Sequence, residues 1–340
     1  MTSRTLLAFC LLLVVSVSLA TAGGPAKVET ILPASTDVLL VIEDTPAFLE
    51  AWAESPWARL WGDPELRSFF APLRQRIQAD RWEEIAQDAT GYPLSEILEN
   101  FTGQIAMAVP DLSEFTFEDD EVKPMGVFAA VADESIARAL LTEDLKRMQA
   151  DAERGEVITE RTERFKGVEL HLRESKQQGE IAPLEGWAVI DGLVILAEPV
   201  SYLQDLVKAA LVGGDRRSLI HNQTYLAVKR RIPETHTYGY FNFIGVRGLL
   251  EEGLAEEMES DEATSMGVTA QGISRALALD ALRCAYFGTQ HLEAETQAEY
   301  GVLYKEERGL IDIAAYLPGP CKKPSFIPPE VLSVGAARFS

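Results

Sequence analysis

The feature that most constrains the fold is a two-residue turn, Asp191-Gly192, between two apolar runs. Trp187 to Ile190 precede the turn, and Leu193 to Ala197 follow it. Asp-Gly readily adopts the positive φ angles of a tight hairpin turn, and strands joined in this way are antiparallel. The turn therefore predicts that this part of the chain belongs to an antiparallel sheet.

Other segments alternate between strand and helix patterns. Strands are predicted where β-branched and aromatic residues gather, and helices where a capping side chain precedes proline or an apolar stripe. The predicted strands are residues 38–42, 101–109, 124–131, 156–162, 167–173, 238–243, 281–287 and 292–304. Predicted helices start near Thr45, Ser55, Asp63, Glu134 and Pro199; Pro72 is expected to interrupt the third, and Gly213 to end the last.

The predicted strand at residues 167–173 alternates apolar and polar side chains. Leu170 and Leu172 belong to one face, whereas Glu169, His171 and Arg173 belong to the other. Such alternation is typical of a sheet with one face in water. We therefore expect the polar face, including His171, to be exposed.

These segments predict an α+β fold in which helices cover antiparallel sheets, as one domain or as two related lobes. An apolar-Pro step precedes a strand three times, at Leu32-Pro33, Ile232-Pro233 and Ile327-Pro328, which indicates a weak internal repeat. The predicted division is an N-terminal lobe at residues 23–215, a second lobe at 216–318, and a Pro-rich connector with a final strand at 319–340.

The first 22 residues have the pattern of a cleavable signal peptide. Arg4 precedes an apolar run from Leu6 to Val15, and small residues follow up to Ala22. The run is shorter than the ~20 residues of a comfortable bilayer span. We therefore expect cleavage between Ala22 and Gly23 and an extracytoplasmic location, periplasmic or secreted, with no transmembrane span afterwards; a retained signal anchor is the alternative.

The chain is strongly acidic, with a formal net charge of -22. Removing residues 1–22 takes away one positive charge, that of Arg4, and leaves -23. Such a field repels nucleic acid and anionic lipid headgroups, and it favours cationic partners, divalent ions or plain solubility. Because 47% of residues are hydrophobic and 25% charged, the chain is ordinary globular material, and we expect no nucleic-acid partner.

Two cysteines, Cys284 and Cys321, follow the predicted signal peptide. An exported chain meets oxidising conditions, so a single disulfide between them is one prediction. Cys284 also lies in a strand-like run, where it fits equally well as a small buried apolar residue.

Common catalytic and metal-binding motifs are absent from the sequence, and we predict neither a cofactor nor a metal site. The four histidines, at 171, 221, 236 and 291, have no second ligand at zinc spacing. We expect His171 and His221 to face solvent. The acidic residues between Asp111 and Glu121 lack the spacing of a calcium loop and are more typical of a solvated loop.

Three tryptophans, Trp52, Trp57 and Trp61, lie close to Phe69 and Phe70. Large rings of this kind stack on ligands or lie at a membrane interface. Trp57 and Trp61 share a helical face by their i, i+4 spacing, which favours packing in a core. The tryptophans are therefore candidate ligand contacts, with core packing as the favoured alternative.

Several of these patterns occur together in a known family. The Leu32-Pro33 step before the strand at 38–42, the stretch from Trp52 to Trp61, and the hairpin that leads to the helix at Pro199 resemble exported bacterial proteins of the domain-of-unknown-function 3352 family, notably planctomycete-like ones. The resemblance implies an α+β architecture and an extracytoplasmic location. It implies no activity and identifies no functional residue.

We therefore expect an exported, non-enzymatic envelope protein that binds or scaffolds an envelope partner. One alternative is an exported hydrolase with a dispersed active site, in which a histidine meets Ser, Thr or a carboxylate beside a concave surface. Another is an acidic ligand-binding protein that uses the aromatic cluster, which requires at least one of the three tryptophans to be well exposed in a cleft.

Overall fold

The computed structural model describes residues 27–76, 81–112, 124–152, 156–177, 180–213, 217–244, 247, 269–293 and 295–305. The described residues up to Phe241 form one compact unit with Tyr286–Gly301, and the described residues of 242–285 and 302–305 form a second. The fold is α+β, as predicted. Among these residues, no helix combines the length and the apolar character that crossing a bilayer requires.

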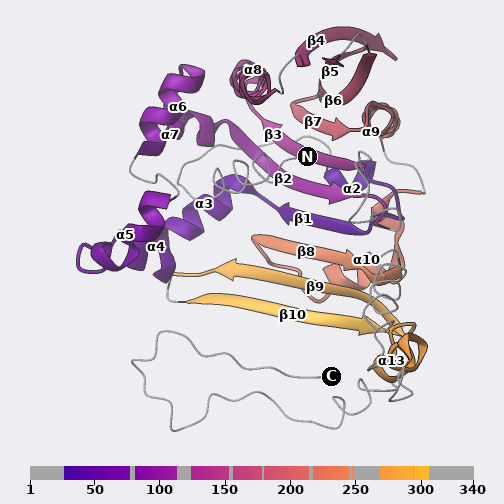
Figure 1. Ribbon diagram of the computed structural model, residues 1–340. Helices are drawn as coiled ribbons and strands as arrows, with labels where there is room; N and C mark the ends of the chain where they lie inside the picture. The colour runs from indigo at the N-terminus through magenta and orange to yellow at the C-terminus, as the bar shows by residue number, and fades with distance from the viewer. Residues whose placement is uncertain are drawn as a thin grey trace. The chain divides into compact units, whose positions relative to one another are not determined.

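A ten-stranded sheet runs through the molecule in the order β10-β9-β8-β1-β2-β3-β7-β6-β5-β4, and the pairings from β8 to β4 are antiparallel (Figure 1). The strands are β1 (Val38–Ile42), β2 (Phe101–Val109), β3 (Met125–Val131), β4 (Glu156–Phe165), β5 (Val168–Gln177), β6 (Glu180–Ile190), β7 (Leu193–Glu198), β8 (Thr237–Asn242), β9 (Leu282–His291) and β10 (Thr296–Tyr304). Strand β8 pairs with β1, so segments from both predicted lobes share one sheet. The predicted boundary between the lobes, at 215/216, falls at residues outside the described ranges.

Helices connect these strands. They are α2 (Val28–Ile31), α3 (Thr45–Glu54), α4 (Pro56–Gly62), α5 (Arg67–Arg76), α6 (Trp82–Thr90), α7 (Leu94–Glu99), α8 (Glu134–Asp151), α9 (Val200–Val212), the 3-10 turn η2 (Leu219–His221), α10 (Gln223–Lys229) and α13 (Ala270–Leu277). Pro72 lies inside α5 and does not interrupt it, which corrects the prediction. Its fixed φ is compatible with a helix, so the proline costs a hydrogen bond without ending this short helix.

The predicted hairpin and the helix after it are confirmed. Asp191 and Gly192 have φ angles of 49° and 77°, and β6 pairs with β7 from Ile190 and Leu193 outward. Helix α9 buries Leu203, Leu206 and Val207, while Ala210 is only partly buried, and the helix ends at Gly213 in the left-handed conformation. Both features are local, which is why the sequence predicts them.

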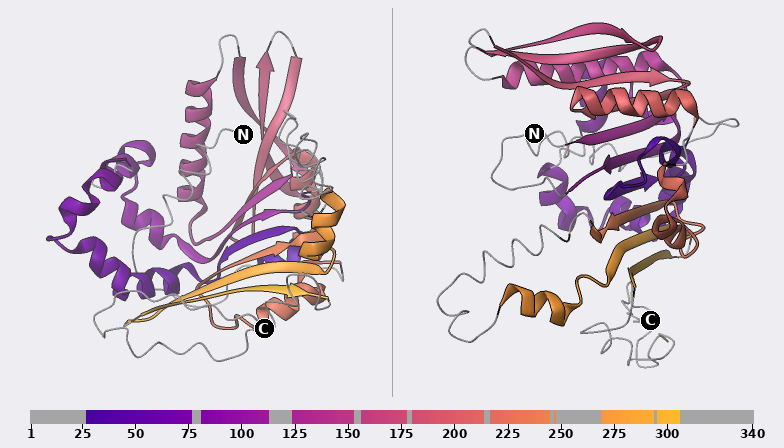
Figure 2. Two further views of the ribbon diagram at one scale, coloured as in Figure 1. Left: turned by 60° about the horizontal axis from the view of Figure 1, so that its bottom comes forward. Right: turned by 90° about the vertical axis from the view of Figure 1, so that its right-hand side faces the viewer.

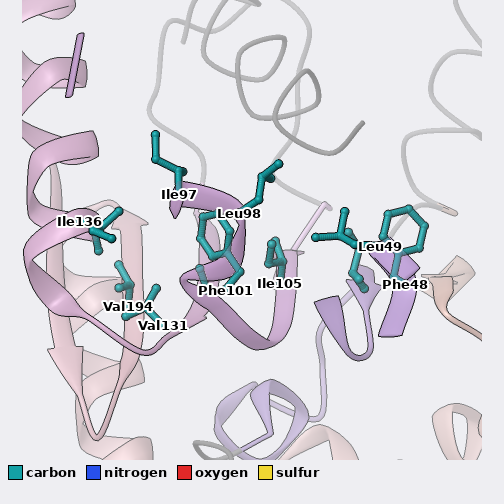
Figure 3. Packing of buried hydrophobic residues seen from close by; sticks show 12 residues of the cluster. Phe48, Leu49, Ile97, Leu98, Phe101, Ile105, Val131, Ile136 and Val194 are labelled. Atoms are coloured by element: carbon teal, nitrogen blue, oxygen red, sulfur yellow. The ribbon is translucent and has the colours of Figure 1, made fainter. Parts of the chain in front are cut away.

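Helices α3, α7 and α8 cover one face of the central strands and form the core cluster (Figure 3). Leu49 of α3, Ile97 of α7 and Ile136 of α8 meet Ile105 of β2 and Val194 of β7. On the outer strands, α8 and α9 lie on opposite sides (Figure 1). A Cβ added at Gly186 would lie 2.8 Å from Leu172 Cδ2 and 2.9 Å from Leu203 Cδ2, so glycine permits the close approach of α9 to β5 and β6.

The second unit contains α13 and the ends of β9 and β10. Ala278, Leu279, Ala281 and Cys284 are buried there, and the backbone N–H of Lys305 donates to the carbonyl of Ala281 at 2.7 Å. Cys321 lies outside the described residues. The buried position of Cys284 fits both predictions for it, and its pairing with Cys321 stays a prediction.

A buried carboxylate attaches α2 to the sheet. Glu29 is 3% exposed, and its Oε1 accepts hydrogen bonds from the hydroxyls of Tyr225 (2.9 Å) and Tyr238 (2.7 Å). Its Oε2 accepts from Gln104 Nε2 at 3.1 Å, and Gln104 Oε1 accepts from the N–H of Val28 at 2.9 Å. Burial is the main cause that raises the pKa of both tyrosines, and the nearby Glu29 carboxylate raises it further. The tyrosines therefore remain protonated donors.

We predict that Glu29→Leu lowers the free energy of unfolding by about 2–5 kcal/mol, because it leaves the hydroxyls and the Gln104 amide without their acceptor. Urea unfolding monitored by tryptophan fluorescence measures the change. The matched control is Glu50→Leu on the exposed side of α3, which we expect to stay near wild type. Equal losses in the two variants would contradict this role for Glu29.

Candidate functional site

The predicted aromatic ligand contacts fall mainly on a helical hairpin, residues 56–76, which contains α4 and α5. In the left view of Figure 2, these helices project away from the strands. Ser55 Oγ accepts from the N–H of Ala58 at 3.2 Å, with Pro56 in the first turn, so the predicted cap of α4 is confirmed. Asp63 Oδ1 accepts from the N–H of Glu65 at 2.7 Å and forms the turn before α5.

The hairpin has its own small aromatic contact. The rings of Trp61 and Phe70 lie 5.3 Å apart, and the Arg74 guanidinium lies 5.2 Å from the Trp61 ring. Phe69 meets Phe70 edge-on at 5.1 Å. These contacts join α4 to α5, yet no residue of α4 is buried. The hairpin is therefore held by its own side chains, by the preceding helix α3 and by the hydrogen bond from Arg59 to the carbonyl of Glu293, without residues of α4 in the core.

Three large apolar side chains of the hairpin are exposed to solvent. Trp57 is 50% exposed, Phe69 75% and Leu73 48%. Phe69 and Leu73 share one face of α5 by their i, i+4 spacing. The core packing expected for Trp57 is therefore wrong, because α4 lies outside the layer of helices that covers the sheet. The ligand-binding alternative requires an exposed tryptophan in a cleft, and Trp57 meets the requirement of exposure.

Trp52 does not belong to this surface. Its ring is partly buried, stacks on Phe48 at 6.3 Å and meets the edge of the His291 ring at 5.2 Å. The predicted cluster is thus divided between a sheet-facing tryptophan on α3 and two tryptophans on the hairpin.

His291 meets one of the partners that the hydrolase alternative requires, and His171, described below, meets carboxylates. It is 8% exposed, and its Nδ1 lies 3.1 Å from Thr296 Oγ1. Burial is the main cause that lowers the pKa of both His291 and His236, and His236 also lowers the pKa of His291. His236 Nδ1 accepts from the N–H of His291 at 3.0 Å, which requires that this nitrogen carry no proton. The ring of His291 is enclosed by Phe48 and Trp52, so its contacts are those of a packed side chain.

The polar face of β5 contains a buried ion network centred on Arg173. The β-sheet register places Arg173 directly opposite Glu160 of β4 and Glu185 of β6. Its side chain is 0% exposed; Nη1 donates to Asp144 Oδ2 at 2.6 Å and also to Glu185 Oε1. Nε lies 3.6 Å from Glu160 Oε2, and Nη2 donates to the carbonyl of Leu141 in α8. The prediction that this face is exposed is wrong for Arg173, because α8 covers it there, whereas Glu169 is exposed as predicted.

His171 lies on the same face and is also mostly buried, at 9% exposed. It stacks on its cross-strand neighbour Trp187 with ring centroids 3.8 Å apart, and Nδ1 lies 3.3 Å from Glu160 Oε1. The Arg138 guanidinium of α8 lies 5.1 Å from the Trp187 ring and 3.0 Å from His171 Nε2. The prediction that His171 is exposed is therefore wrong. His221 is exposed as predicted.

Three carboxylates, those of Asp144, Glu160 and Glu185, lie around Arg173. The pKa values of Glu185 and of Glu198 at the end of β7 are raised. Burial raises the pKa of Glu185, and Asp144 adds to this, although Arg173 opposes it. Burial, with the Glu185 charge second, raises the pKa of Glu198 to about 7. The excess of negative charge is therefore relieved when Glu198 holds its proton. Within the described ranges, no group of three or more His, Cys, Asp or Glu residues is placed to hold a metal ion.

The sequence did not identify Arg173, Glu185 or Glu198 as partners. The only available signal was that charged residues at 160, 173 and 185 fall on three consecutive strands, and their alignment depends on a register that the sequence does not specify. Ala22, Gly23 and most of the acidic loop, residues 113–123, lie outside the described residues.

We predict that Arg173→Leu lowers the free energy of unfolding by about 3–5 kcal/mol, because it removes a fully buried cation from two partly buried carboxylates, those of Asp144 and Glu185. The control is Arg161→Leu on β4, whose side chain is 50% exposed and which should unfold close to wild type. The measurement is urea unfolding at neutral pH. Adding Asp144→Leu and Glu185→Leu to the first variant should restore part of the loss; no recovery would count against an electrostatic origin.

Glu198 predicts a pH dependence of stability. In the folded chain its carboxyl keeps a proton up to about pH 7, whereas the unfolded chain releases it near 4.5. The folded state therefore binds more protons between these values, and the wild type loses stability as the pH rises through this window. We expect Glu198→Gln, which cannot ionise, to gain in Tm relative to wild type from pH 4.5 to 7, measured by differential scanning fluorimetry. A Tm difference that is constant across this window would refute the shift.

Comparisons with known proteins give no match: no family model matches the chain, and neither the curated proteins nor the solved structures include one similar to it at the threshold applied. The resemblance to the domain-of-unknown-function 3352 family therefore stays a prediction from the sequence motifs.

Proposed function

We propose that the chain is an exported, extracytoplasmic envelope protein that acts by binding or scaffolding rather than by catalysis, with hairpin 56–76 as its contact surface. The observation that carries the proposal is the exposure of Trp57, Phe69 and Leu73 on a hairpin whose α4 contributes nothing to the core. Exposed apolar side chains gathered in one short segment are typical of interaction sites.

The polar groups of the molecule support a binding role. Arg173, Asp144 and Glu185 engage one another beneath α8, and His171 is stacked on Trp187. Such contacts connect β4, β5 and β6 to α8, so these side chains are occupied in holding the sheet and the helix together. The export signal predicted at residues 1–22 supports the envelope location.

The test combines location with surface. The full chain is expressed in a bacterium with an envelope, and the cell is divided into cytosol, periplasm and membranes; mass spectrometry then identifies the amino terminus. We expect an amino terminus at Gly23 and enrichment in the envelope fractions. An uncleaved chain, with Met1 intact, in the cytosol would overturn the proposal.

The contact surface is tested in the same cells with Trp57→Ala/Phe69→Ala/Leu73→Ala. We expect this variant to be exported and folded but to lose its retention with washed envelopes. The control is Ile181→Ala/Val212→Ala, which removes exposed apolar side chains on β6 and α9. Retention that is equal in the hairpin variant and in this control would remove the hairpin from the proposal.

A further inference from the structure

The hairpin differs in charge from the rest of the chain. Residues 56–76 contain Arg59, Arg67, Arg74 and Arg76 against Asp63 and Glu65, a net charge of +2. Since the whole chain carries -22, the remaining residues carry -24. The segment with the exposed aromatic side chains is thus locally basic in an acidic protein.

Basic and apolar residues alternate along this segment. Trp57 lies two residues before Arg59, and Phe69 and Leu73 lie between Arg67 and Arg76. Arg59 donates to the carbonyl of Glu293, a neutral acceptor, and Arg74 lies over the Trp61 ring. Tryptophan with arginine beside exposed apolar groups is typical of segments that lie at the membrane interface.

We propose that hairpin 56–76 binds the surface of a bilayer that contains anionic lipids, with Trp57, Phe69 and Leu73 entering the interface and the net positive charge of the segment attracting the headgroups. This rests on the proposed function, in which the hairpin is the contact surface. The net charge of the whole chain alone would predict repulsion from anionic headgroups. Charges beyond about 8 Å are, however, largely screened at physiological salt. A headgroup beside the hairpin therefore experiences mainly the local arginines.

The size of the surface favours a bilayer over a protein partner. A stable protein interface uses about 20–30 residues on each side. Here the exposed large apolar groups are three side chains of one short hairpin, which is the scale of an interfacial anchor. An anchor of this size gives reversible binding that depends on both the apolar and the charged residues.

The experiment is co-sedimentation of the full mature chain with phosphatidylcholine vesicles, with or without phosphatidylglycerol. We expect binding to the anionic vesicles that weakens with salt, and much weaker binding to pure phosphatidylcholine. Trp57→Ala/Phe69→Ala should bind at least about tenfold more weakly, because it removes two rings from the interface. Arg67→Gln and Arg76→Gln should each cost about fivefold.

Matched controls separate the hairpin from the general surface. Ile181→Ala removes an apolar side chain that is 61% exposed on β6, and Arg164→Gln removes an exposed arginine of β4; both should bind like wild type. Thermal unfolding checks that every variant is folded. Wild-type chain that ignores both vesicles, binds both equally, or binds as well without Trp57 and Phe69 would overturn the inference.

These outcomes are distinct from those of the envelope test. If the hairpin variant loses envelope retention while wild type ignores lipid vesicles, the contact surface stands and its partner is a protein, so the lipid inference is wrong. If wild type binds anionic vesicles through the hairpin but remains in the cytosol in cells, the lipid inference stands and the envelope proposal is wrong.

Discussion

The outer half of the sheet depends on the burial of one positive charge. Arg173 is inaccessible to solvent, and a guanidinium in that position is tolerated only with close carboxylates. Glu160 and Glu185 come from the neighbouring strands by register, but Asp144 must come from α8. The ion network therefore requires α8 to lie over β5 with one side of the helix facing the sheet. The core formed by Ile136 and Ala137 is consistent with the same placement.

This arrangement has an electrostatic consequence at the end of β7. Burial is the main cause that raises the pKa of the partly buried Glu198, and the negative charge of Glu185, a partner of Arg173, raises it further. The proton on Glu198 is thus linked to the network through Glu185. Breaking a buried ion pair is costly even where the pair itself adds little stability, and here such a break would accompany any change in the register of β4, β5 and β6 under α8.

The sequence predicts those features that depend on a few neighbouring residues. Asp191-Gly192 fixes a hairpin, Ser55-Pro56 begins α4 and Gly213 ends α9, because each is determined by the backbone preferences of the residues involved. It does not predict which side of a strand is covered. His171 and Arg173 alternate with leucines as on a wet sheet, and only the packing of α8 makes their face an interior. Likewise, the spacing of Trp57 and Trp61 predicts a shared helical face but not whether anything packs against it. Thus the fold class could be predicted from the sequence, whereas the polar network could not. For the candidate site, the sequence predicted the residue types but not their exposure.

Stability and binding are assigned to different parts of this chain. The core cluster and the Glu29 and Arg173 networks involve the sheet and the helices α2, α3, α7, α8 and α10, whereas no residue of α4 is buried. A hairpin that the core does not need is free to keep apolar side chains in water, at a cost that the rest of the fold offsets. The hairpin is also basic. In a chain with this many carboxylates, arginines are not needed for solubility. Under the proposed function, the exposed rings and the net positive charge of the hairpin contact something outside the molecule, whereas Arg59 and Arg74 also make contacts within it.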